Sequence, residues 1–210
     1  MKKQYLILSM IAISLMLTAC NDTHNLEIKE AENNVTIKPV GDISAKLQTY
    51  PFEEAIKVSE LIAEIKIIEK VQELNEPSPK TIFKATMTEV LKNDSGLPTD
   101  SLHFMQQGNS DWTFNDNEMF QQGEKYILFL KHAKEIQEEH TYWILGEETG
   151  MYKIINDRYI AKLSERDEAL ADIEDIKLSD ELKKSKNSKE IQVLQTEEFR
   201  EKIKKSLMRN

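Results

Sequence analysis

The side chains suited to acid–base or metal chemistry are scattered along this chain rather than grouped. Its four histidines show no spacing of the kind that places two ligands on one helix face: His24, His103, His132 and His140. Only folding could bring such distant residues together around a zinc ion. We therefore expect no metal site, although an enzyme site assembled by the fold stays open as an alternative.

Oxygen-rich side chains gather in one glycine-bounded stretch, between Gly108 and Gly123. The carboxylates and amide there, which could in principle hold calcium, are Asp111, Asp116, Asn117 and Glu118. Calcium loops of the EF-hand type place ligands at alternating positions around a central glycine, and this stretch does not. We expect a polar loop whose side chains satisfy its own turns.

Motifs for nucleophilic or phosphate chemistry are absent from the sequence. It contains no Gly-x-Ser-x-Gly elbow and no glycine-rich phosphate loop. Adjacent carboxylates occur as Glu53-Glu54, Glu138-Glu139 and Glu147-Glu148. Because neighbours on a strand point to opposite faces, such pairs rarely share a proton, and we interpret most of them as solvated surface. No catalytic residue and no cofactor is expected.

The one cysteine, Cys20, has the most specific surroundings. Lys2 and Lys3 precede an apolar run from Tyr5 to Leu17, and Leu17-Thr18-Ala19-Cys20 follows. This is the layout of a secretory signal, and its end resembles a bacterial lipobox, in which the cysteine thiol receives diacylglycerol before cleavage in front of it. We predict a signal peptide over residues 1–19 and a lipid-anchored protein on the outer face of the cell membrane.

Two other interpretations of this apolar run fit less well. A transmembrane helix needs about 20 apolar residues, and positions 5–17 supply 13 with two serines among them. A plain secreted protein would leave the cysteine at the cleavage site by coincidence. Since the chain has no second cysteine, it forms no internal disulfide, and its core alone must stabilise it.

The charge of the mature chain excludes some partners. The predicted signal carries two of the 28 basic residues and none of the 37 acidic ones, so the remaining 26 basic residues leave a net charge of −11. An acidic protein is unsuited to binding nucleic acid. The charge favours solubility first, and more weakly an immunity-type lipoprotein that neutralises a basic toxin or hydrolase.

Residues 20–50 are polar and predict a tether, with one added strand possible at Val35–Val40. Pro51 begins a short predicted helix that reaches Ser59. Residues 59–71 fit a helix or a strand, and the alternation of Ala63, Ile65 and Ile67 with charged residues favours the strand.

The rest of a predicted domain at 51–163 consists of short β segments. Alternating or continuous apolar runs separated by turn residues predict strands at 81–91, 101–107, 126–130, 141–145 and a hairpin at 151–163. The nearly continuous apolar run at 126–130 indicates a strand covered on both sides. Six or seven such strands predict a mainly β fold, a small barrel or sandwich.

Residues 164–210 form a predicted charged helical extension. This range is dominated by Glu, Asp and Lys and has no glycine or proline. Near-helical spacing of apolar residues predicts an amphipathic helix from about Lys189, with an apolar face of Ile191, Leu194, Phe199, Ile203 and Leu207. This face could dock on the barrel or recruit a partner, and docking is favoured.

The middle of the chain, about residues 58–163, resembles a known type of domain. The segments that carry the likeness lie at 61–67, 83–92, 120–130 and 143–154, and the most specific is Gly123-Glu124-Lys125-Tyr126-Ile127-Leu128-Phe129-Leu130. They are similar to bacterial surface and lipoprotein domains with a five-stranded OB-type barrel, related in shape to the netrin-like domain of tissue inhibitors of metalloproteinases. The resemblance implies an OB-like barrel of five to six strands.

The resemblance does not carry protease inhibition with it. In those inhibitors a free N-terminal cysteine chelates the zinc of the target enzyme. Here the mature N-terminus would be Cys20, with lipid on its sulfur, and no partner cysteine exists. A shared fold without that residue is only a scaffold.

The aromatic residues of the 108–123 loop are the best candidates for a contact surface. OB-type barrels often bind ligands through exposed aromatic side chains. Trp112 and Phe114 lie in the polar loop, whereas Trp143 lies in an alternating strand and is expected in the core. The leading hypothesis is a lipid-anchored module without catalytic activity, which binds an extracytoplasmic protein or a wall-associated ligand.

Overall fold

A computed structural model of the chain describes residues 39–96, 100–134, 140–186 and 190–209. The predicted signal peptide, Cys20 and the predicted tether up to residue 38 lie outside the described residues. Among those described, no helix has the length and apolar character needed to cross a membrane.

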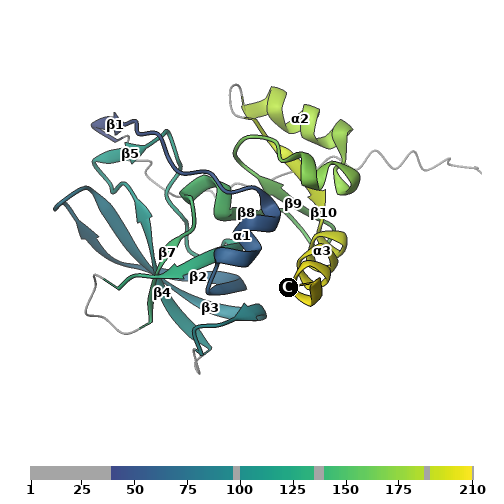
Figure 1. The fold of residues 1–210 in the computed structure, drawn as a ribbon. Helices are drawn as coiled ribbons and strands as arrows, with labels where there is room; N and C mark the ends of the chain where they lie inside the picture. The colour runs from purple at the N-terminus through teal and green to yellow at the C-terminus, as the bar shows by residue number, and fades with distance from the viewer. Residues whose placement is uncertain (1–38, 97–99, 135–139, 187–189, 210) are drawn as a thin grey trace, which may run out of the picture. The chain divides into compact units, whose positions relative to one another are not determined.

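Ten strands and five helical segments make up the described chain (Figure 1). The strands are β1 Gly41–Ile43, β2 Leu61–Leu74, β3 Lys80–Asn93, β4 Ser101–Gln107, β5 Trp112–Phe114, β6 Lys125–His132, β7 Thr141–Ile144, β8 Met151–Ile154, β9 Tyr159–Lys162 and β10 Gln192–Gln195. The helices are α1 Phe52–Val58, α2 Ile176–Lys186 and α3 Thr196–Arg209, with short 3₁₀ segments η1 Glu147–Gly150 and η2 Glu168–Ile173.

Five of these strands close into a barrel. In the order β2, β3, β4, β7 and β6 each strand pairs with the next, and β6 returns to pair with β2. The β4–β7 pair is parallel and the other four pairs are antiparallel. From β6 the sheet continues outward through β8, β9 and β10. The closed barrel with its C-terminal helix confirms the predicted mainly β fold class.

Side-chain alternation along β6 explains why the barrel needs helices outside it. Leu128 and Leu130 belong to the cluster inside the barrel, whereas Ile127 and Phe129 belong to a second cluster on the outer face. The strand is therefore covered on both sides, as its continuous apolar sequence predicts.

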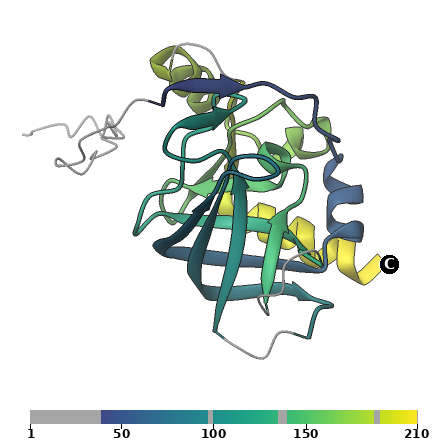
Figure 2. The same cartoon turned by 90° about the vertical axis from the view of Figure 1, so that its left-hand side faces the viewer.

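The outer cluster is covered by α1 and α3, which lie side by side in both ribbon views (Figures 1 and 2). Phe52 of α1 and Phe199 of α3 have ring centroids 5.4 Å apart, and Phe199 lies 4.5 Å from the ring of Tyr152. Phe199 and Ile203 are fully buried. The apolar face of the C-terminal helix therefore docks on the barrel.

The start of that helix differs from the prediction. Residues 192–195 form β10, which pairs antiparallel with β9, and α3 begins at Thr196. Ile191 and Leu194 therefore lie beside and within a strand rather than on the helix. The physical reason is the open edge of β9, whose backbone groups gain hydrogen-bond partners when residues 192–195 are extended.

A network of ion pairs holds α3 against the barrel strands. The Arg200 guanidinium contacts the carboxylates of Glu64 on β2 and Glu89 on β3, and the latter contact is 3.1 Å. Thr88 Oγ1 also donates to Glu64, at 3.0 Å. Because Glu64 is buried, its charge depends on these partners.

Strand β1 lies within the range predicted as a tether. It pairs in parallel with β5, and the two form a small sheet separate from the barrel. The segment that follows runs on to Pro51 and α1.

Candidate functional site

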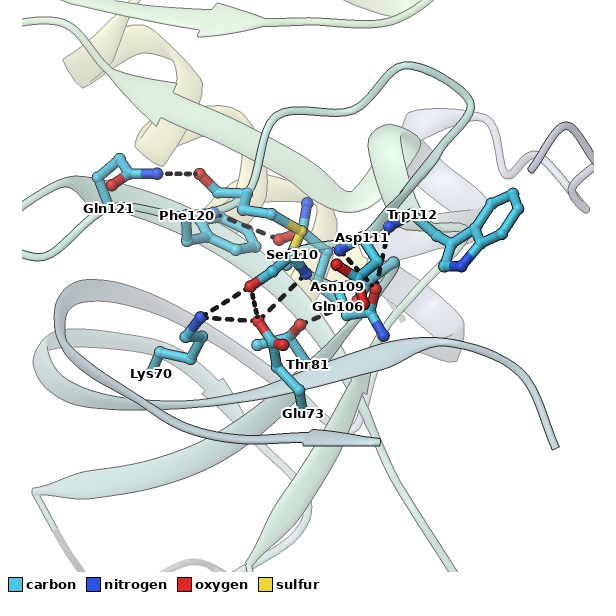
Figure 3. A network of polar contacts seen from close by, with 12 residues as sticks. Lys70, Glu73, Thr81, Gln106, Asn109, Ser110, Asp111, Trp112, Phe120 and Gln121 are labelled. Atoms are coloured by element: carbon cyan, nitrogen blue, oxygen red, sulfur yellow. Dashed lines mark hydrogen bonds and ion pairs between the residues drawn. The ribbon is translucent and has the colours of Figure 1, made fainter. Parts of the chain in front are cut away.

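A polar network joins the β2–β3 hairpin to the loop after β4 (Figure 3). Glu73, near the end of β2, accepts hydrogen bonds from the Ser110 hydroxyl and, at 3.2 Å, from the Ser110 backbone N–H. Lys70 pairs with the same carboxylate at 2.7 Å. Burial raises the pKa of Glu73, but the bonds from Lys70 and Ser110 outweigh it and hold the pKa below its usual value.

Asn109 sets the shape of this loop. Its side-chain oxygen accepts from the backbone N–H groups of Asp111 and Trp112, both at 3.0 Å, and its amide nitrogen donates to Asn75 at 2.8 Å. Gly108 precedes it with φ +95°, and a Cβ there would lie 2.8 Å from the Trp112 carbonyl oxygen. Only glycine fits that position, because of its positive φ and the close backbone.

The remainder of the loop is fastened to the barrel by Gln106. Its amide donates to the Glu118 carbonyl at 2.9 Å, and its oxygen accepts from the Phe120 N–H at 3.3 Å. Phe120 packs its ring edge against Tyr126, with centroids 4.6 Å apart, inside the barrel cluster. The loop residues that present Trp112 are thus anchored on both sides.

The two aromatic residues predicted as a binding surface have different environments. Trp112 is 40% exposed, and Figure 3 shows its ring pointing away from the polar network. Phe114 is only 8% exposed, so the prediction that it offers its ring to a ligand is wrong. Strand alternation places Trp112 and Phe114 on the same side of β5, so the burial of Phe114 reflects its own neighbours at the end of β5, where it pairs with Ile43 of β1. Trp143 is half-buried and packs beside Met105, with the Lys80 ammonium 5.9 Å from its ring.

Glu147 is the carboxylate that sequence reasoning placed wrongly. The Glu147-Glu148 pair was expected among the solvated carboxylates, yet Glu147 is 5% exposed. It follows Gly146 at the end of β7, and both have left-handed backbone, with φ 46° and 61°. This turn directs the side chain to the end of β4, where Oε1 accepts from the Gln107 N–H at 3.4 Å.

The environment of Glu147 favours its neutral form. The pKa of Glu147 is raised to about 8. Burial is the main cause, the hydrogen bond from the Gln107 N–H lowers the pKa in part, and the charge of Glu148 raises it. Its Oε2 is buried without a hydrogen-bond partner among the described residues. A strained, buried acid is a feature often found at functional sites.

A buried Lys162–Ser164 pair lies at the end of β9. The Lys162 ammonium donates to the Ser164 hydroxyl at 2.5 Å and to the Glu165 carbonyl. Burial lowers the pKa of Lys162, against the opposing charge of Asp167. A lysine beside a serine can in principle activate a nucleophile. Here both side chains are buried.

The other side chains that could bind a metal form no metal site among the described residues. Among the residues that the structure describes, no three His, Cys, Asp or Glu side chains come together as metal ligands. His24 and the Glu138-Glu139 pair lie outside the described residues. In the 108–123 loop, Asp116 N–H donates to Asp42 at 2.9 Å and Asn117 is buried.

A pocket of about 280 Å³ lies where α1, β3 and α3 meet, lined by Ile56, Lys57, Lys92, Asp94 and Leu207. Lys92 donates to the carbonyls of Ile56 and Ser59 at 3.0 and 2.5 Å and pairs with Asp94 at 3.0 Å. Its ammonium therefore caps the end of α1 rather than facing the pocket as a free charge.

These features define a class of protein: a closed five-stranded β-barrel with a docked C-terminal helix and a rigid loop that exposes one tryptophan. Comparison with known protein families and with curated proteins finds no match for this chain.

The sequence singled out Trp112 because an aromatic side chain in a polar loop is an unusual combination, and the structure shows this side chain exposed. Sequence reasoning missed Glu147 and Lys162, whose burial depends on elements distant in the chain. The Gly146-Glu147 turn after a strand is the one local signal that could have singled out Glu147.

Proposed function

We propose that this protein is a lipid-anchored, extracytoplasmic binding module without catalytic activity, whose ligand is a protein or a wall-associated molecule. Diacylglycerol on Cys20 would hold it to the outer face of the membrane. The barrel would act as a rigid support, of the OB-like kind, for the contact surface.

The observation that carries the proposal is the exposed indole of Trp112 on a loop fixed by Asn109, Gly108 and Glu73. Tryptophan on a preformed surface supplies large contact area at little cost in conformational entropy. The two buried titratable groups, Glu147 and Lys162, are assigned structural roles in this proposal.

The proposed binding role of Trp112 is tested by recovering the acylated protein and its partners from its own membranes, in parallel with a Trp112→Ala variant. Met208→Ala serves as the matched control, because Met208 is an exposed apolar residue at the far end of α3. We expect Trp112→Ala to lose its partners while circular dichroism shows an unchanged fold. An unchanged set of partners would refute the role of this loop.

The anchor is tested separately with Cys20→Ser. Without the thiol no thioether to glycerolipid forms, so this chain should be released into the medium or remain uncleaved. Firm membrane retention of a correctly cleaved Cys20→Ser chain would contradict lipid anchoring.

A further inference from the structure

Residues 40–45 lie along β5 in the manner of a bound peptide. Strand β1 pairs with β5 in parallel register, Gly41 opposite Trp112 and Asp42 opposite Thr113 (Figure 1). The two strands form their own sheet, apart from the barrel. The question is whether another extended segment would fit the same edge.

Several contacts recognise the backbone of this segment rather than its side chains. The Gly41 N–H donates to the Asp111 carbonyl at 3.1 Å, and the Asn115 N–H donates to the Ile43 carbonyl at 3.0 Å. The Asn115 side chain accepts from the Ala45 N–H at 3.0 Å and donates to the Ala45 carbonyl at 3.1 Å. Such contacts suit any extended chain, as in recognition by strand addition.

Two positions are selective for sequence. A Cβ on Gly41 would lie 2.4 Å from Cζ3 of Trp112, so any larger residue at this position requires the Trp112 ring to move, and glycine is favoured. One residue on, the Asp42 carboxylate accepts from the Thr113 hydroxyl at 2.7 Å and from the Asp116 N–H at 2.9 Å. The β5 edge therefore favours a segment in which glycine is followed by an acidic residue.

The chain's own segment is held only at the surface. Val40 is 79% exposed, and Asp42, Ser44 and Ala45 are also exposed. A pair of strands three residues long contributes little stability by itself. Backbone hydrogen bonds that are exposed to solvent also break and re-form readily. Displacing the segment would leave the barrel core intact, because no residue of 40–45 belongs to it.

We propose that the β5 edge, with Trp112, Thr113 and the Asp116 N–H, is a binding site for an extended peptide of a separate protein that carries glycine followed by an acidic residue. Residues 40–45 occupy the site as a displaceable internal competitor. The inference rests on the proposed binding function, since it names the class of partner that the Trp112 surface takes.

The internal segment sets the conditions for the test. A tethered competitor acts at an effective concentration in the millimolar range, so the intact chain should bind a free peptide weakly. Gly41→Leu should weaken the pairing of the segment with β5, because the new side chain would overlap the Trp112 ring in its present position. Residue 41 lies outside the barrel cores, so this variant keeps its fold.

The probe is a fluorescently labelled peptide, Val-Gly-Asp-Ile-Ser-Ala, which copies residues 40–45, and the readout is its fluorescence anisotropy. The protein is the full chain carrying Cys20→Ser, with and without Gly41→Leu. We expect binding to the Gly41→Leu chain to be at least tenfold tighter than to its parent. Asp42→Ala removes the contacts of the segment with Thr113 and Asp116 but adds no side chain that overlaps Trp112. It should therefore give a smaller increase in peptide affinity. Leucine in place of the peptide's glycine, or Trp112→Ala in the protein, should weaken binding at least tenfold.

Absence of peptide binding to the Gly41→Leu chain would overturn the inference. Concentration-dependent dimers of the parent chain that Gly41→Leu abolishes would assign the site to a second copy of this protein, and would also overturn it. If Trp112→Ala loses its partners in the membrane recovery experiment while the peptide fails to bind, the proposed function stands and this inference alone fails.

Discussion

Glu147 should make the stability of this protein depend on pH in a direction opposite to that of most carboxylates. The folded state holds its pKa at about 8, against 4.5 when the side chain is free. Between these values the folded chain keeps a proton that the unfolded chain has lost. The contribution of Glu147 to the free energy of unfolding therefore falls as pH rises from about 4.5 to about 8, and this contribution is level outside that window.

The size of the effect follows from the shift. Each pH unit well inside the window changes the free energy of unfolding by about 1.4 kcal/mol. Because the change flattens near pH 8, the expected loss between pH 5 and pH 8 is about 3–4 kcal/mol. This is a large part of the roughly 5–15 kcal/mol that stabilises an ordinary domain.

Glu147→Gln isolates this contribution. Glutamine has the shape of the protonated acid and keeps an oxygen to accept from the Gln107 N–H, but it does not titrate. Urea unfolding at pH 5, 6, 7 and 8 should show the variant close to wild type at pH 5 and more stable at pH 8. The other titrating groups are common to both proteins and cancel in the difference.

A stability difference between Glu147→Gln and wild type that stays constant from pH 5 to pH 8 would refute the reasoning. It would mean that Glu147 is ionised in the folded protein, and that water or a counter-charge satisfies its second oxygen.

Three further substitutions test the packing that holds the site in place. Phe199→Ala should lower the free energy of unfolding by about 3–5 kcal/mol, because it empties a buried space between α1 and the barrel; a urea midpoint near wild type would contradict docking of α3. Arg200→Ala should cost about 1–3 kcal/mol by leaving the buried Glu64 carboxylate short of a partner, and Glu64→Gln in the same chain should recover part of the loss. Lys92→Met should cost about 1 kcal/mol through the uncapped end of α1, with amide exchange faster in α1 and unchanged in the barrel.

Local patterns determined most of the barrel strands. The alternation in 101–107 gives β4 with the predicted bounds, and Leu102 and Phe104 point inward as expected. In 59–71, two periodicities competed, and pairing of β2 with both β3 and β6 decides for the strand. Periodicity works here because the alternate residues Leu61, Ala63, Ile65 and Ile67 of β2 all belong to the cluster inside the barrel.

Features that depend on partners distant in the sequence could not be predicted in this way. Spacing of three between Ile191 and Leu194 fits a helix, and only the free edge of β9 makes the segment a strand. Similarly, Phe114 is expected to be exposed in a polar loop, but it is buried at the end of β5, opposite Ile43 of β1. The burial of Glu147 depends on the end of β4, forty residues earlier in the chain.

The outer face of β6 explains why the hydrophilic range 164–210 belongs to the core. Ile127 and Phe129 point away from the barrel interior, and the cluster that covers them draws residues from α1, α3, η2 and the strands from β8 onward. Few apolar residues suffice for this, since each helix needs a single buried stripe. The charged residues between them keep the extension soluble, while Arg200 pairs with the barrel carboxylates at the contact. A composition dominated by Glu and Lys is thus compatible with a structural part, because the position of its few apolar side chains decides what it covers.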